Sequence, residues 1–226
     1  MRQVSFSYPG ADYNAIAATQ NITTTTGGFV ELNGALGFYS PGSYGLRPLW
    51  AVMPGIQRTI GVFSTGNLSA VVFFASGVDT DGRVVTASFI GATGGSSAAT
   101  DSFATFTSEF HQVNAIFCSS AATSNFTAGT GATGSTRWCM MDQYATPFSV
   151  AVTVLTATGR AVTIQSTQND PNVATSPTTF DHATGSLTAN TNTTGYSLPA
   201  RFVRGIVTTA TGEATTISTL MIQQAG

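Results

Sequence analysis

The sequence predicts an all-β fold made of antiparallel β-sandwich or jelly-roll-like units, two of them, with an extended N-terminal arm. Apolar residues alternate with polar ones along short segments, as Phe148, Val150 and Val152 do. Turn signals rich in glycine separate these segments at short intervals. No segment shows the periodicity of an amphipathic helix. These three observations together favour an antiparallel β protein.

The N-terminal segment differs from the rest of the chain. Residues 1–28 end in the polar, glycine-terminated run "NITTTTGG". A segment of this kind becomes ordered mainly against a neighbour, so we expect an arm or an added strand. The first β unit follows at 29–140, and we expect its early and late strands at 29–36, 58–64, 103–107 and 113–119.

A hairpin is predicted within the segment 69–91, where two apolar runs flank Asp81-Gly82. Its first run, Val71-Val72-Phe73-Phe74-Ala75, is apolar on both faces, because successive side chains of a strand point in opposite directions. A second layer should therefore cover the outer face: the other β unit, the arm or another copy of the chain. Val72 and Phe74 are candidate protein-contact residues on this argument.

The segment 37–55, "GFYSPGSYGLRPLWAVMPG", is an insertion punctuated by Gly and Pro. It carries the aromatic residues Phe38, Tyr39, Tyr44 and Trp50. Exposed aromatic residues stack on ligands or anchor protein contacts, so we expect a contact surface here. The alternatives are a satellite core beneath a long loop and, less well supported, carbohydrate binding.

Low-complexity sequence interrupts the strand pattern at 91–102 and 119–136, and we expect both segments to be loops. A boundary near 137–146 then precedes a second β unit at 147–226. Two hairpins are predicted in that unit, over 147–167 and 200–224. Their turns are Thr158-Gly159-Arg160 and Thr211-Gly212-Glu213.

Charged residues are scarce. Only 8% of the 226 residues are charged, and there is no lysine, whereas about 25% is usual in globular domains. A hydrophobic content of 42% with fifteen Phe indicates a folded chain rather than a disordered one. A surface with so few charges is poorly protected against association, so we expect much of it to contact partners. The net charge of −2 and the scattered arginines argue against direct nucleic-acid binding.

Two motif matches fail on their context. Residues 129–134 fit G-x-G-x-x-G, but a dinucleotide site requires a strand before the motif and a helix after it. A P-loop is excluded because it needs a lysine. The "DTDG" at 79–82 resembles a calcium loop, yet Ser88 stands where that loop has its bidentate Glu. We therefore expect a hairpin turn there.

The ionisable residues do not form a recognisable catalytic or metal site. His111 and His182 lack a partner at metal-ligand spacing. Asp181-His182 is more simply a packed pair near Arg201 or Arg204 than part of a triad, since no G-x-S-x-G elbow is present. We predict no enzymatic activity, no catalytic residue, no metal and no cofactor.

Cys118 and Cys139 are too few for a disulfide framework, and we expect them to be free, buried thiols. The opening residues lack the apolar segment of a signal peptide, and no apolar run approaches the ~20 residues that span a bilayer. We expect synthesis in a cytosol without export, and no membrane partner.

Several segments in fixed order resemble a family of bacteriophage virion structural proteins. They are "GGFVELNGAL", "RTIGVFSTGNLSAVVFFASGVDTDGRVVTASFIG", "YATPFSVAVTVLTATGRAVTIQSTQNDP", "TTFDHATGSLTANTNTTGYSLPARFVRGIVTT" and "TISTLMIQQAG". The fourth contains the Tyr-x-x-Pro-x-Arg-x-x-Arg pattern at Tyr196, Pro199, Arg201 and Arg204. The resemblance covers nearly the whole chain and is interrupted at the insertion 37–55.

The resemblance implies a virion structural component that is made in the cytoplasm of a host bacterium and has no catalytic residues. The first expectation is a head decoration (cement) protein, which stabilises the capsid by bridging neighbouring subunits. Its partners would be the major capsid protein or neck proteins, and its own copies, as a homotrimer. The alternative is a neck, collar, tail fibre or spike component that binds other virion proteins or host surface glycans.

Overall fold

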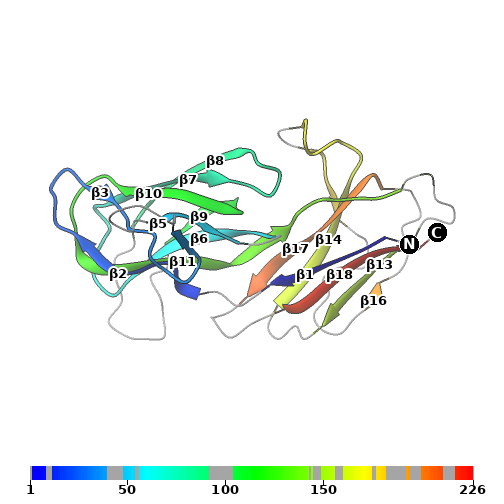
Figure 1. Ribbon diagram of the computed structural model, residues 1–226, viewed down its shortest axis with the longest axis horizontal. Helices are drawn as coiled ribbons and strands as arrows, with labels where there is room; N and C mark the ends of the chain where they lie inside the picture. Colours follow the sequence, from blue (N-terminus) through cyan, green and yellow to red (C-terminus); the bar gives the residue numbers. More distant parts are fainter. Residues whose placement is uncertain are drawn as a thin grey trace. The chain divides into compact units, whose positions relative to one another are not determined.

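The computed structural model describes residues 2–8, 12–39, 48–53, 56–91, 104–142, 144, 149–155, 160–174, 177–181, 192–193, 200–210 and 217–225. The regular secondary structure of these residues is entirely β, and their strands pair antiparallel (Figure 1). The predicted all-β antiparallel fold is confirmed. Within the described residues, no helix is long and apolar enough to cross a membrane.

Contacts group the chain into two units, which we call the 11–131 unit and the terminal unit, the latter formed by residues 1–10 and 132–226. The strands of the 11–131 unit are β2 (Asp12–Ile22), β3 (Gly28–Phe29), β4 (Gly37–Tyr39), β5 (Pro48–Val52), β6 (Ile56–Ser64), β7 (Val72–Val78), β8 (Val84–Ile90), β9 (Ala104–Phe110), β10 (Gln112–Cys118) and the first part of β11 (Ala122–Thr136). Those of the terminal unit are β1 (Arg2–Tyr8), the end of β11, β12 (Cys139–Met140), β13 (Ser149–Leu155), β14 (Arg160–Thr167), β15 (Phe180–Asp181), β16 (Asn192–Thr193), β17 (Phe202–Ala210) and β18 (Ile217–Ala225). Separate folding of 29–140 and 147–226 stays a prediction.

The 11–131 unit is a sandwich of two layers. One layer is a six-stranded sheet in the order β4-β5-β10-β7-β8, with β3 paired to β10. The other contains β2, β11, β6 and β9. The rings of Phe73 from β7 and Phe126 from β11 meet edge to face at 5.5 Å, and both side chains are buried. Burial of these rings with Ile16, Ile60 and Ile116 holds the two layers together.

The β7–β8 hairpin is confirmed. Its register runs without a break from Val72 opposite Ile90 to Val78 opposite Val84. Gly82 has a φ of 79°, a conformation that glycine adopts readily. The Asp79 carboxylate accepts hydrogen bonds from the backbone N–H groups of Asp81 and Arg83, both at 2.9 Å. Asp79 therefore closes the turn, as expected of a hairpin rather than a calcium loop.

The prediction of a loop at 119–136 is wrong, because residues 122–136 form the strand β11. Small residues are needed there, because neighbouring strands approach the backbone of β11 closely. A Cβ atom on Gly129 would lie 2.0 Å from the Asp12 carbonyl oxygen, and one on Gly131 would lie 2.3 Å from Thr59 Oγ1. The G-x-G-x-x-G match thus reflects close strand packing.

The two hairpins predicted in the terminal unit are also wrong in their pairing. β13 pairs with β18 and β16, whereas β14 pairs with β17 and β15. The chain therefore passes from the four-stranded sheet to the eight-stranded sheet between β13 and β14, and returns between β17 and β18. Alternation and turn residues identify the strands correctly, but they do not specify a partner that is distant in sequence.

The N-terminal residues form added strands, which is one of the two forms expected for 1–28. β1 pairs with β18 in the terminal unit, and β2 pairs with β11 in the 11–131 unit. The strand expected at 29–36 is short, since only Gly28–Phe29 is assigned to β3. Its continuation is held by a hydrogen bond from the Val30 N–H to the Ile116 carbonyl at 2.8 Å.

Candidate functional site

Three phenylalanines form a row across the outer face of the six-stranded sheet. Phe117 of β10 lies opposite Phe29 of β3 on one side and opposite Phe74 of β7 on the other. The rings of Phe29 and Phe117 meet edge to face at 5.3 Å. Phe29 is 70% exposed and Phe74 is 45% exposed. Opposite residues of an antiparallel pair point to the same face, so the row is a continuous aromatic ridge.

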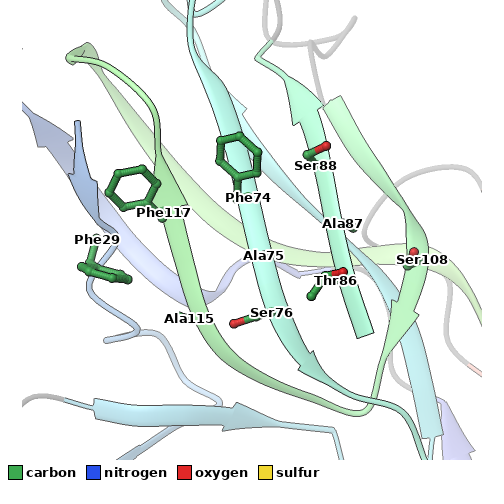
Figure 2. A pocket seen from close by; sticks show the side chains of 10 residues that line it. All are labelled: Phe29, Phe74, Ala75, Ser76, Thr86, Ala87, Ser88, Ser108, Ala115 and Phe117. Atoms are coloured by element: carbon green, nitrogen blue, oxygen red, sulfur yellow. The ribbon is translucent and has the colours of Figure 1, made fainter. Parts of the chain in front are cut away.

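Small residues beside this ridge leave a hollow of about 550 Å³ (Figure 2). Ala115, Ser76 and Thr86 stand opposite one another in the next row of the sheet. The ten residues that line the hollow are Phe29, Phe74, Ala75, Ser76, Thr86, Ala87, Ser88, Ser108, Ala115 and Phe117. None of them is ionisable.

The hollow has two chemically distinct sides. Figure 2 shows the rings of Phe29, Phe117 and Phe74 on one side. The hydroxyl side chains of Ser76, Thr86, Ser88 and Ser108 stand on the other. These hydroxyls make no side-chain hydrogen bond to another residue of the described part of the chain. Each can donate and accept, so the surface can take an apolar group and a neutral polar group side by side.

Further apolar side chains extend the same face. Val72 is half-buried opposite Ile90, which is 62% exposed, and Val84 is 80% exposed at the other end of β8. Exposed apolar surface that is continuous across several strands marks an interaction site. The residues that line this concave surface offer apolar contacts and neutral hydrogen-bonding groups to a bound partner.

Val72 and Phe74, two of the predicted contact residues, therefore lie on this face. Phe38 and Trp50 are brought together as cross-strand partners of β4 and β5, with Tyr39 opposite Pro48. Residues 37–39 and 48–52 thus belong to the six-stranded sheet, where β5 pairs with β10. Tyr44 lies outside the described residues.

Phe29 and Phe117 are the residues that the sequence analysis missed. The alternation in "VNAIFCS" places Ile116 and Cys118 on the buried face, and Phe117 therefore on the outer one. That signal was present in the sequence. The position of Phe117 between Phe29 and Phe74 depends on strand pairing, which the sequence does not reveal.

Other polar groups hold the fold together. Asp181 accepts a hydrogen bond from Gln165 Nε2 at 2.8 Å, and Gln165 Oε1 accepts from Arg204. His182, the other half of the predicted pair, lies outside the described residues. His111 Nδ1 is 2.9 Å from the Ile56 carbonyl oxygen. The described residues contain no group of three or more His, Cys, Asp or Glu arranged to hold a metal ion.

Comparison with known proteins gives no relative: no family model, no curated protein and no solved structure matches the chain. The resemblance to phage virion proteins stays a prediction.

Proposed function

We propose that the protein is a non-enzymatic structural component of a bacteriophage virion that works by adhesion, most simply as a head decoration protein. The observation that supports this proposal is the aromatic face of the 11–131 unit, whose hollow is lined by ten uncharged residues that include Phe74. A surface of this kind is costly to leave in water and gains free energy when another surface covers it.

The magnitude of this gain suits a repeated structural contact. Covering one large apolar side chain contributes roughly 1.5–3 kcal/mol. Phe29, Phe74 and Phe117 each offer the exposed part of such a contribution, and none of the residues that line the hollow carries a charge that must be desolvated. Each single contact is modest, but contacts repeated around a symmetric shell reinforce one another. A protein that binds the assembled shell better than its separate subunits stabilises the shell.

The test is co-sedimentation of the purified chain with heads of the phage that encodes it, prepared without this chain. We expect saturable binding that persists at high salt, because none of the ten residues that line the hollow carries a charge. Phe74→Asp should abolish that binding, since it places a charge in the contact. Asn125→Asp adds the same charge at an exposed position of β11 in the other layer, and it should bind as the unmodified chain does.

The proposal fails if both variants bind heads as well as the unmodified protein. It also fails if binding disappears at moderate salt, because that result would indicate a contact between charged groups instead of this face.

A further inference from the structure

We propose that Tyr144 of one copy of the chain occupies the hollow of the next copy. This inference rests on the proposed function only in taking the aromatic face as a contact surface. It adds that a second copy of the chain covers this surface and that Tyr144 is the side chain that enters the hollow.

The shape of the hollow argues against the simplest self-contact. Two identical hollows placed face to face would enclose a void, and an unfilled void loses the packing that stabilises an interface. The occupant must therefore project from its own surface. It must also be neutral, because a charge placed among these uncharged side chains would lose its hydration without gaining a partner.

The two sides of the hollow define the occupant more closely. The aromatic side favours a ring, which packs edge to face against phenylalanine. The hydroxyl side favours a neutral group that can donate and accept a hydrogen bond. A tyrosine side chain combines the two, since its ring is apolar and its hydroxyl lies at the tip.

Among the side chains that the structure describes in the terminal unit, that of Tyr144 is an exposed tyrosine. Tyr144 is 84% exposed, which makes it the most exposed of the large apolar side chains in the described residues. The other exposed side chains of this class in the described part of the terminal unit, those of Met140, Val173 and Phe180, carry no hydroxyl. They would leave the hydroxyl side of the hollow unused.

The backbone beneath Tyr144 is held locally. Its N–H donates to Asp142 Oδ1 at 3.0 Å, which closes an Asx turn. The Asp142 carboxylate is thereby engaged at the base of the turn. No hydrogen bond or ring contact of the Tyr144 side chain to another described residue is present. Because the Tyr144 N–H is already bonded, insertion of the ring needs little further ordering of that backbone group.

A contact between a projecting ring and a hollow elsewhere on the same chain is heterologous. Repetition of such a contact closes a ring of copies if the rotation permits, and otherwise gives an open chain. The homotrimer expected for a head decoration protein would be a ring of three such contacts.

Analytical ultracentrifugation of the full chain over a concentration series tests the proposal. We expect the unmodified protein to self-associate and both Tyr144→Ala and Phe74→Asp to remain monomeric at concentrations at least tenfold higher. Tyr144→Phe, which keeps the ring, should weaken association by roughly threefold to tenfold. Both positions are exposed, and far-UV circular dichroism should show unchanged folding.

Mixing the two monomeric variants provides the decisive measurement. The Tyr144→Ala chain keeps its hollow and the Phe74→Asp chain keeps its tyrosine, so one contact can form between them. We expect a 1:1 dimer that grows no further. A mixture that stays monomeric overturns the proposal, as does a Tyr144→Ala chain that associates normally.

Head binding separates this inference from the proposed function. An unmodified chain that is monomeric at every concentration, yet binds heads through Phe74, overturns the inference and leaves the function standing. A Phe74→Asp chain that loses self-association but still binds heads contradicts the assignment of head binding to the aromatic face and supports the inference.

Discussion

Phe73 and Phe74 are neighbours in β7, but their side chains lie on opposite faces of the six-stranded sheet. Phe73 is completely buried between the two layers, where it stacks on Phe89 at 5.4 Å. Phe74 stands in the outer hollow and is 45% exposed. A strand that is apolar on both sides therefore serves the core with one face and presents a contact surface with the other.

This pair gives the first prediction. Phe73→Ala should lower the free energy of unfolding by roughly 3–5 kcal/mol, because it leaves a cavity in the core. Phe74→Ala should change it by less than about 1 kcal/mol, since its ring is partly in water already. Urea denaturation of the two variants measures the difference. Equal losses would show that Phe74 is a core residue and would remove the central residue of the proposed contact.

The strands of the 11–131 unit were largely predictable, because alternation and turn residues act locally. The β7–β8 hairpin is an example, since Gly82 and the Asp79 carboxylate determine its turn without help from distant residues. The strand β11 was not predictable in this way. Gly129 and Gly131 are needed because Asp12 and Thr59, which are distant in sequence, lie close to the backbone of β11.

Only part of the candidate site was predicted, because only part of it depends on the local sequence. The two-faced pattern around Phe74 could be seen within a single strand. The ridge of Phe29, Phe117 and Phe74 arises only when β3, β10 and β7 pair in one register. The pairing of β13 with β18 was not predicted either, because the residues of a strand do not indicate a partner strand that is distant in sequence.

A second prediction concerns Arg58, which is buried in the 11–131 unit at 2% exposure. Its Nε donates to the Gly131 carbonyl oxygen at 3.0 Å, and its Nη2 donates to the same atom. Arg58→Met preserves most of the packing but leaves that carbonyl without these donors. We expect a loss of roughly 1–3 kcal/mol in unfolding free energy. Arg137→Ala, at an exposed site, is the control and should cost less than about 1 kcal/mol. Equal stability of the Met variant would contradict the argument.

A third prediction compares two glycines with almost the same positive φ angle. Gly27 and Gly82 have φ values of 77° and 79°. A Cβ on Gly27 would lie 1.9 Å from the Cys118 carbonyl oxygen, whereas one on Gly82 meets nothing within 4 Å. Gly82→Ala should therefore cost only the conformational term of about 1 kcal/mol. Gly27→Ala should cost clearly more and should displace Phe29, so thermal unfolding and head binding should both be impaired. Similar melting temperatures for the two variants would refute this reading of the close approach.

The last prediction concerns Cys118, whose free thiol is buried on the inner side of β10, next to Phe117. Burial raises the pKa of this thiol above its ordinary value of 9.0, although hydrogen bonds with the backbone of Gly28, Cys118 and Ser120 act in the opposite direction. The thiolate is the reactive form, so a thiol-specific reagent should label the folded chain slowly at pH 8 and rapidly in urea. Above pH 9.0 the unfolded chain loses the Cys118 proton while the folded chain retains it, so stability should fall as the pH rises toward the raised pKa. Cys118→Ala should flatten that part of the stability profile, whereas Cys139→Ala serves as the matched control. An unchanged slope in the Cys118 variant would assign the alkaline loss to other groups.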